Sequence, residues 1–336
     1  MDKTRFVLLF TDKHTMDGLM MIIRSMALLL LSLLPLNVTV ALPQSNMTEL
    51  HIGSSTINVH FESSFTSQQK QKLLKWLGAT ANTMTTLYGE FPVKQSNIHI
   101  YTSSRTSEPV PWGEVWKNGE YKINFHVNPN FSQQDFLDDW TAPHEFSHLF
   151  HPYPGRGNSW FGEGLASYYQ NILRSRYGSM TEQLAFQKLY NGFQRGIKNQ
   201  KRTGLTLKQA SAAMRKNRSF MHVYWGGAAY FLNVDVRLHQ SSHGKQSLDN
   251  TWLKFKECCL GADRYWPLHR LIPKLDELSN SSIFSDEYNR IIDGRTFPDY
   301  QSSFEQLGIS VRDNKIILSK TGEAQALRHA LAKQKN

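Results

Sequence analysis

Two histidines and a glutamate near the middle of the chain have the residue types and the spacing of a metal site. The segment reads His144-Glu145-Phe146-Ser147-His148, an H-E-x-x-H pattern. Residues four positions apart in a helix project from one face about one turn apart, so both imidazoles can bind one ion. The usual Zn–N distance is about 2.0–2.1 Å. Glu145 would lie beside the ion, where a carboxylate can accept a proton from water that the metal holds.

A third candidate ligand follows fifteen positions after His148, at Glu163. It comes after two aromatic residues and precedes an apolar segment, residues 165–169. A carboxylate from a second helix would complete three protein ligands and leave the fourth position open, as in catalytic zinc sites. The alternative is an amphipathic core helix whose two histidines are simply hydrogen-bonded. The apolar and aromatic residues around both segments favour the metal site.

The order of these motifs resembles the gluzincin metallopeptidases, and most closely the glycyl-aminopeptidase-like family related to aminopeptidase N. The resemblance rests on H-E-x-x-H, on the block at residues 160–169 (W-F-G-E-G-L-A-S-Y-Y) and on residues 223–228, and it covers most of residues 130–310. It implies a zinc cofactor and a gluzincin-type catalytic domain that hydrolyses peptide bonds. The implied zinc ligands are His144, His148 and Glu163. Glu145 would be the general base, and Tyr224 would stabilise the oxyanion.

The motifs do not indicate whether the substrate is cleaved at its amino terminus or at an internal peptide bond. Aminopeptidases of this group carry a strand whose glutamate binds the free amino terminus of the substrate. Residues 112–115 and 118–121 match the sequence pattern of that strand only weakly. Aminopeptidase and endopeptidase activity are therefore equally open. Two other function classes also remain: a catalytically inactive zinc-binding protein of the cell envelope, and a membrane-surface protein with structural zinc. The intact Glu145 argues against inactivity, because a structural zinc site needs no general base.

The ends of the predicted domains follow from composition and patterning. A chain of 336 residues with 40% hydrophobic residues can bury a sizeable core. We predict an α+β fold in which a small mixed sheet lobe and a helical lobe enclose a zinc cleft. The expected parts are a leader (1–41), a sheet-containing lobe (42–131), a metallopeptidase core (132–267) and a C-terminal helical segment (268–336).

The leader has the pattern of an export signal. Arg24 precedes the apolar run Met26–Leu36, and small residues occupy positions 39 and 41. This pattern predicts a signal peptide that is cleaved after Ala41, and hence a periplasmic or secreted protein. The apolar run is short for a transmembrane span. An uncleaved membrane anchor is the alternative.

A strongly basic segment lies between residues 183 and 234. The chain has a formal net charge of +10, and this segment contains no Asp or Glu. Its basic residues are Lys188, Arg195, Lys198, Lys201, Arg202, Lys208, Arg215, Lys216 and Arg218. The expected substrate is a peptide or protein. The basic surface could also bind an anionic membrane, an acidic polymer or an acidic substrate, although a solvated basic surface is the simpler interpretation. No nucleic-acid-binding motif is present, and no nucleic acid is expected as a partner.

Local patterns predict most of the secondary structure. Strands are expected at residues 57–61, 98–101, 112–116, 121–127 and 316–318, with an Asn-Gly turn at 118–119. Helices are expected after the caps Thr66 and Ser132, and over 165–177, 181–193, 207–214, 227–239 and 247–259. Pro143 requires either a kink or a new helix start near Thr141.

The remaining candidate residues have simpler interpretations. His60, His99 and His126 fall within strands and are interpreted as sheet residues. His151 could contact the substrate or orient a ligand. Asp138 or Asp139 could orient an imidazole through its other nitrogen, although a solvent-facing position is the default for both. Cys258 and Cys259 are adjacent, and because a disulfide needs a particular Cα separation and torsion, we expect them to pack on a helix and not to bridge.

Overall fold

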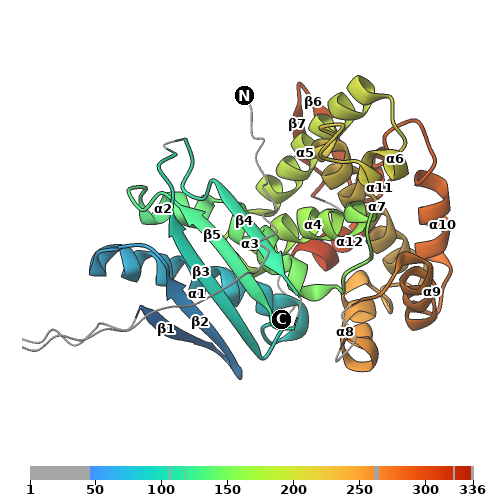
Figure 1. The fold of residues 1–336 in the computed structure, drawn as a ribbon. Helices are drawn as coiled ribbons and strands as arrows, with labels where there is room; N and C mark the ends of the chain where they lie inside the picture. Colours follow the sequence, from blue (N-terminus) through green and yellow to red (C-terminus); the bar gives the residue numbers. More distant parts are fainter. Residues whose placement is uncertain (1–45, 106, 118, 261–264, 321, 334–336) are drawn as a thin grey trace, which may run out of the picture. The chain divides into compact units, whose positions relative to one another are not determined.

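The first part of the fold is a mixed five-stranded sheet (Figure 1). The computed structural model describes residues 46–105, 107–117, 119–260, 265–320 and 322–333. The strands are β1 (Met47–Ile52), β2 (Ser55–Phe61), β3 (Gln95–Thr102), β4 (Trp112–Trp116) and β5 (Lys122–Val127), in the order β1-β2-β3-β5-β4. The pairs β2–β3 and β3–β5 are parallel, while β1 and β4 run antiparallel to their neighbours. β4 is therefore an edge strand.

The rest of the described chain is mainly helical. The helices are α1 (Ser67–Tyr88), α2 (Gln133–Asp138), α3 (Thr141–Ser147), the 3₁₀ helix η1 (His148–Phe150), α4 (Ser159–Tyr177), α5 (Glu182–Thr203), α6 (Leu207–Ala212), α7 (Phe220–Ser241), α8 (Leu248–Cys259), α9 (Leu268–Ser279), α10 (Ile283–Ile291), α11 (Gln301–Gln306) and α12 (Gly322–Ala332). A hairpin, β6 (Ile309–Arg312) and β7 (Lys315–Leu318), precedes α12. The predicted mixture of helix and sheet is confirmed.

One face of the sheet is buried under α1 and α3. Alternate residues of β2, β3 and β5 are fully buried, as the period-two pattern requires. Trp76 of α1 meets Phe125 of β5 edge-on, with ring centroids 5.2 Å apart. Phe146 of α3 lies 6.2 Å from the same ring. The apolar face of the sheet therefore fixes α3, the helix that contains the first half of the H-E-x-x-H motif.

Pro143 lies in the first turn of a new helix, as one of the two predictions stated. α3 begins at Thr141, and the backbone N–H of Thr141 donates to the Asp139 carboxylate at 2.7 Å. The first N–H groups of a helix have no intrahelical acceptor, so proline removes no hydrogen bond there. Ser132 and Thr66 cap α2 and α1 as predicted, each in a capping box.

The start of α7 differs from the prediction. We expected a helix from Gly227, but α7 begins at Phe220 and places Tyr224 inside the helix. Two consecutive glycines weaken helix propensity, and here tertiary packing overrides that preference. A Cβ atom on Gly227 would lie 2.1 Å from the carbonyl oxygen of Trp160 and 2.7 Å from Cα of Gly164 in α4. The glycines therefore let α4 and α7 cross with their backbones in contact.

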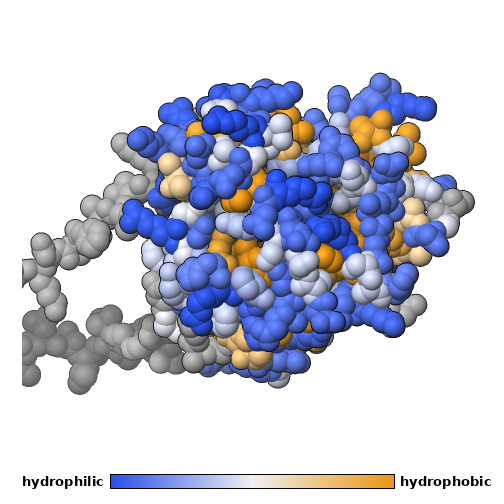
Figure 2. Space-filling model, turned by 90° about the vertical axis from the view of Figure 1, so that its right-hand side faces the viewer, coloured by the Kyte–Doolittle hydropathy of each residue, from blue (hydrophilic) through white to orange (hydrophobic). Residues whose placement is uncertain are grey.

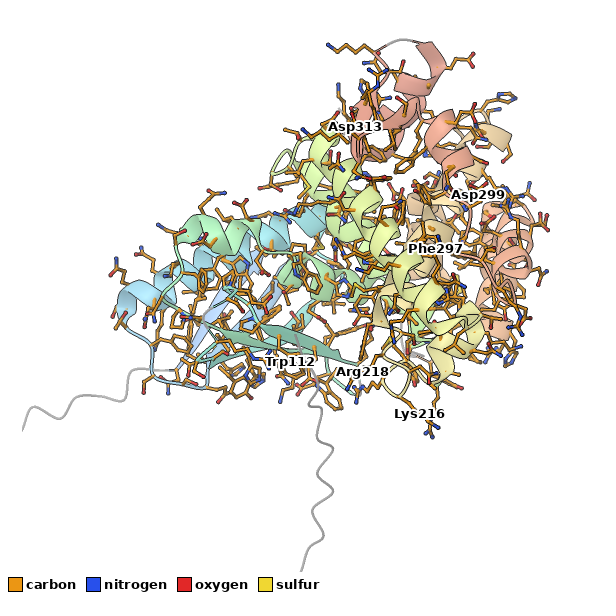
Figure 3. The ribbon with its side chains drawn as sticks, turned by 90° about the horizontal axis from the view of Figure 1, so that it is seen from above. Trp112, Lys216, Arg218, Phe297, Asp299 and Asp313 are labelled. Atoms are coloured by element: carbon orange, nitrogen blue, oxygen red, sulfur yellow. A yellow bond between two sulfur atoms is a disulfide. The ribbon has the colours of Figure 1, made fainter. Side chains whose placement is uncertain are left out.

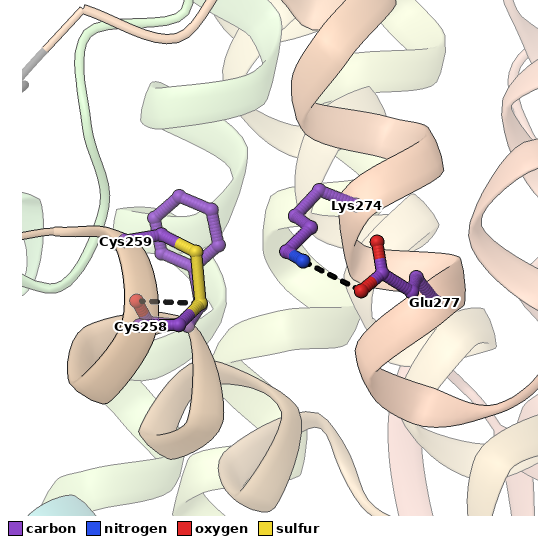
Figure 4. Close-up of a disulfide and its surroundings, with 5 residues drawn as sticks. Cys258, Cys259, Lys274 and Glu277 are labelled. Carbon is purple, nitrogen blue, oxygen red and sulfur yellow. Dashed lines mark hydrogen bonds and ion pairs between the residues drawn. A yellow bond between two sulfur atoms is a disulfide. The ribbon is translucent and has the colours of Figure 1, made fainter.

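The adjacent cysteines also differ from the prediction. Cys258 and Cys259 form a disulfide at the end of α8, shown in Figure 4 beside the ion pair of Lys274 and Glu277. Our expectation relied on the separation that a disulfide usually needs. The two Cα atoms are 3.7 Å apart, so neighbouring positions bring the sulfur atoms within bonding reach without any tertiary approach. The expectation of two unbridged cysteines was wrong.

The helices at the right of Figure 1 bury one side and expose the other. α9 buries Leu271, Ile272 and Leu275, and α10 buries Phe284 and Ile291. Figure 2 shows this face covered mostly by hydrophilic residues, with hydrophobic ones in small separate groups. Among the helices in the described ranges, none combines the length and the apolar character that crossing a bilayer requires. The predicted leader, residues 1–41, lies outside the described residues, and the predicted domain boundaries stay predictions.

The backbone contact between α4 and α7 predicts a sharp cost for one methyl group. Gly227→Ala should lower the free energy of unfolding by about 3 kcal/mol, since overpacking against backbone atoms cannot be relieved by a rotamer change. Gly78→Ala in α1 is the matched control, because a Cβ there meets nothing within 4 Å. That variant should gain about 0.5–1 kcal/mol from helix propensity. Denaturant unfolding measures both, and equal stabilities would contradict the assigned contact.

Candidate metal centre

Three side chains with metal-binding atoms converge where η1 meets α4. The Nε2 atom of His144 lies 3.2 Å from the Glu163 carboxylate, and that of His148 lies 3.7 Å from the same oxygen. The ligand atoms of the three residues all lie within 4.8 Å of one another. Within the described ranges, this is the one group of three or more His, Cys, Asp or Glu side chains close enough to hold an ion.

The helix that carries the two histidines is short. His144 belongs to α3, whereas His148 opens η1, which ends at Phe150 before the extended residue His151. The chain then continues through residues 152–158 to the start of α4 at Ser159. The 3₁₀ turn keeps the two rings close, with centroids 5.0 Å apart. Glu163 lies in the second turn of α4 and faces both rings.

Gln170 orients the first imidazole. Its Oε1 atom accepts a hydrogen bond from Nδ1 of His144 at 2.8 Å, and Gln170 is buried. In the neutral ring the proton therefore sits on Nδ1, and the lone pair of Nε2 points at Glu163. Gln170 was not among the candidate residues predicted from the sequence. Its spacing could have revealed it, because it follows Glu163 by seven positions, two turns along the same face of α4.

His151 orients the second imidazole, which is one of the two roles considered for it. Its Nδ1 atom lies 2.6 Å from the carbonyl oxygen of Pro152, which can only accept, so this nitrogen carries the proton. Its Nε2 atom then accepts from Nδ1 of His148 at 3.0 Å. The lone pair of Nε2 in His148 is left facing Glu163. Gly162 makes room for this ring, since a Cβ there would lie 2.7 Å from Cε1 of His151.

Asp138 and Asp139 do not orient an imidazole. Asp139 accepts from the backbone N–H of Thr141, and Asp138 accepts from the Gln134 amide at 3.1 Å. Asp139 is buried, and burial raises its pKa to about 6. His60, His99 and His126 lie in strands as expected, and the rings of His60 and His99 stack 4.6 Å apart.

The charges of the three candidate ligands are coupled. Burial has the largest single effect on His144 and opposes its protonation, but the contact with Glu163, the charges of Glu145 and Glu163 and the bond to Gln170 together outweigh burial and raise its pKa. Burial also favours the neutral form of Glu163, and the bonds and charges of the histidines outweigh it and lower its pKa. Burial holds the pKa of His148 well below its usual value. Glu163 is thus a carboxylate, and His148 is a neutral imidazole that can donate its lone pair to a cation.

Glu145 lies beside this cluster and against the edge strand β4. A Cβ atom on Gly113 would lie 2.8 Å from Cγ of Glu145, so a glycine is needed for the two segments to approach. Glu145 is 8% exposed. Burial, together with the charges of Glu163 and Glu114, raises its pKa to about 7, against the effect of His144. A carboxyl group with such a pKa can both accept and release a proton near neutrality.

Tyr224 of α7 completes the group. Its ring stacks on His144 with centroids 5.6 Å apart, and its hydroxyl hydrogen-bonds Glu163. Burial raises the pKa of Tyr224 well above its usual value, and the charges of Glu163 and Glu145 act in the same direction. The hydroxyl therefore stays protonated and can donate a hydrogen bond.

The donor set fits a zinc ion. Ligand atoms around a tetrahedral zinc are about 3.3 Å apart, given Zn–N and Zn–O distances of about 2.0–2.1 Å. The two separations from the Glu163 oxygen, 3.2 and 3.7 Å, are close to that value. Both imidazoles have their non-coordinating nitrogen bonded to an acceptor, which is the usual arrangement for zinc-binding histidines.

Two surface hollows lie away from the candidate metal centre. These hollows, of about 230 and 330 Å³, lie against the sheet and are lined in part by Asn97, Glu120 and Trp116. None of their lining residues belongs to the candidate metal centre. The zinc cleft between two lobes therefore remains a proposal.

Comparisons with known proteins agree with the resemblance found in the sequence. The family model of the M61 glycyl aminopeptidases matches residues 152–229, a range that contains Glu163 and Tyr224 but not the H-E-x-x-H motif. A search of curated protein sequences gave no match.

One solved structure shares the fold, and a second is similar at a lower score. An aminopeptidase N family protein from Idiomarina loihiensis superposes with a TM-score of 0.60 at 16% identity, over 83% of this chain and 52% of that one. An M1 zinc metallopeptidase from Deinococcus radiodurans gives a TM-score of 0.45 at 11% identity, over 76% of this chain and 52% of that one. This chain thus spans about half the length of these proteins. The predicted relationship is confirmed: the chain resembles the gluzincin metallopeptidases, with an M61 glycyl aminopeptidase match over residues 152–229 and the fold of an aminopeptidase N family protein.

Proposed function

We propose that this chain is a zinc-dependent peptidase in which His144, His148 and Glu163 bind the ion. One observation carries the proposal: the Nε2 lone pairs of the buried His144 and the half-buried His148 both face the Glu163 carboxylate. A structural core would need neither this orientation nor a second carboxylate beside it. The family match and the fold of a peptidase relative support the same assignment.

The residues around the ion have separate roles. Zinc, when bound, would polarise the peptide carbonyl and lower the pKa of a water molecule. The carboxylate of Glu145 accepts the proton of the attacking water and later delivers it to the leaving amine nitrogen. The Tyr224 hydroxyl donates a hydrogen bond to the carbonyl oxygen as negative charge develops there. A catalytically inactive zinc protein is the alternative, and the buried Glu145 beside the ligands argues against it.

The edge strand β4 is the proposed site for the peptide backbone. Among the described strands, β4 comes last in the sheet order and pairs with β5 along one side. An extended peptide could add to this edge with backbone hydrogen bonds. Gly113 would then place the peptide next to Glu145. Aminopeptidase activity would need a glutamate that binds the free amino terminus of the substrate. Glu114 is the acidic residue of β4, and it accepts a hydrogen bond from Asn124, so β4 does not decide between aminopeptidase and endopeptidase activity.

Substitution separates metal binding from proton transfer. Glu145→Gln should keep about one zinc per chain and lose turnover by at least about 10²-fold, because only the proton acceptor is lost. His148→Ala should lose both zinc and turnover, since two ligands hold the ion weakly. Metal content after dialysis and cleavage of a peptide library measure the two effects. Full zinc content in His148→Ala would refute the ligand set.

Tyr224 offers a test of the oxyanion role. Tyr224→Phe keeps the ring that stacks on His144 and removes only the hydroxyl. We expect kcat to fall by about 10²–10³-fold with KM and zinc content unchanged, the usual cost of one lost oxyanion donor. An unchanged kcat would show that Tyr224 only packs.

The basic segment supports a second role as a contact to an anionic membrane surface. Eight of its nine basic residues are exposed, and Lys188 is half-buried. Figure 3 shows Lys216 and Arg218 at the periphery of the molecule, on the loop before α7. We also propose that the chain is exported after cleavage near Ala41, with an uncleaved anchor as the alternative. The disulfide supports export, because disulfides persist in oxidising compartments.

Vesicle binding tests this second role. The chain should sediment with phosphatidylserine vesicles at about 0.05 M salt and dissociate at about 0.5 M, because each basic side chain near the surface contributes about 1 kcal/mol that salt screens. Neutral vesicles are the control. Lys198, Lys201 and Lys216 changed together to Gln should weaken binding. Binding that ignores salt and lipid charge would exclude an electrostatic contact.

A further inference from the structure

A lysine from the sheet reaches the end of the helix that carries the histidines. Lys117 directly follows β4, and its Nζ atom donates hydrogen bonds to the carbonyl oxygens of His148 and His151, the second at 2.5 Å. His151 is the residue whose ring orients His148. One ammonium group therefore contacts the backbone of a proposed zinc ligand and the backbone of the residue that orients this ligand.

These carbonyl groups need a donor that the helix does not supply. The last carbonyls of any helix lack the N–H groups of a following turn. Here η1 ends at Phe150, His151 is extended with φ −127° and ψ 154°, and Pro152 has no N–H to offer. A lysine ammonium provides charge-assisted hydrogen bonds at this end, where the helix dipole also favours a positive charge. Without Lys117, both carbonyl groups would require water.

The backbone positions that Lys117 fixes determine the orientation of the His148 imidazole. The His151 ring is buried between the Pro152 carbonyl and Gly162, whose missing Cβ leaves it space. This ring can accept from Nδ1 of His148 only while the carbonyls of both residues keep their relative positions. Lys117 holds these two carbonyls at one point. β4 thus contacts both halves of the motif, through Gly113 at Glu145 and through the following Lys117 at His148.

We propose that Lys117 and His151 are positioning residues that set the orientation of His148 for metal binding. The proposal rests on the proposed zinc site, and it assigns a role to the segment joining β4 and β5 that the sequence motifs do not indicate. Neither residue contacts the position of the ion. Lys117 acts through the backbone of His148 and His151, and His151 acts through the proton on Nδ1 of His148.

The chain provides a matched control for the lysine. Lys72 of α1 also donates to two backbone carbonyls, those of Pro129 at 2.7 Å and Phe131 at 2.5 Å, in a loop that carries no metal-site residue. Lys117→Met and Lys72→Met both keep the aliphatic stem and remove the ammonium. Loss of two hydrogen bonds alone should affect the stability of the two variants similarly. Only Lys117→Met should affect the metal.

The experiment measures zinc affinity by chelator competition and the Co²⁺ absorption spectrum of the full chain. Lys117→Met and His151→Phe should bind zinc about 10–100-fold more weakly than wild type, the usual cost of losing a partner of a ligand. Lys72→Met should bind like wild type. His151→Asn, which can both accept and donate, should recover most of the affinity that His151→Phe loses. The Co²⁺ spectrum should change in Lys117→Met and His151→Phe and return in His151→Asn.

A second measurement does not need the metal. Nitrogen-15 spectra of the histidine side chains in the metal-free wild type should show His148 protonated at Nδ1, and His151→Phe should lose this preference. Zinc affinity and His148 tautomer that stay at wild-type values in Lys117→Met and His151→Phe would overturn the proposal. Failure of wild type to bind zinc would refute the proposed function separately, because the tautomer of His148 would still report on His151.

Discussion

The close contact between α4 and its neighbours is the constraint on which the candidate centre depends. Consecutive residues of α4 each serve a different neighbour: Gly162 leaves room for the His151 ring, Glu163 faces both imidazoles, and Gly164 lets α7 approach to backbone contact. Two turns later, Gln170 accepts from His144. Because the directions in which the residues of a helix project are fixed relative to one another, moving α4 would disturb all four contacts together.

The electrostatics of the centre follow from burial that is only partly compensated. Four ionisable side chains, His144, Glu145, His148 and Glu163, lie close together, and burial alone would favour the neutral form of each of them. The carboxylate of Glu163 keeps its charge because both histidines face it, and His148 stays neutral. Glu145 has no such partner, so burial and the neighbouring carboxylates raise its pKa to about 7. The same environment therefore leaves Glu163 charged and gives Glu145 a pKa near neutrality, as the proposed roles of ligand and proton acceptor require.

The structure corrected two expectations, and each correction has a local cause. Two consecutive glycines indicated a helix start at Gly227, but they lie inside α7, where the approach of α4 requires them. Adjacent cysteines were expected to stay unbridged, yet neighbouring Cα atoms 3.7 Å apart bring the sulfur atoms of Cys258 and Cys259 together. In both cases a rule about typical local geometry was weaker than the packing or covalent geometry at that position.

Patterns local in the sequence were sufficient to predict β2, β3, β4, β5 and β7, most helices, the helix caps Thr66 and Ser132, and the grouping of His144, His148 and Glu163, but not the strands β1 and β6. Their information is short-range, in helical spacing, period-two alternation and residue type. Gln170, Gly113 and Lys117 received their roles only from the tertiary structure, which also decided between the two roles considered for His151. Each acts on a residue from another element or beyond a helix end, through a contact distance or a hydrogen bond that spacing does not encode. The sequence by itself therefore determined which residue types occur at the spacing of metal ligands, and the packing of α4, β4 and α7 decided which histidine nitrogen atoms face Glu163.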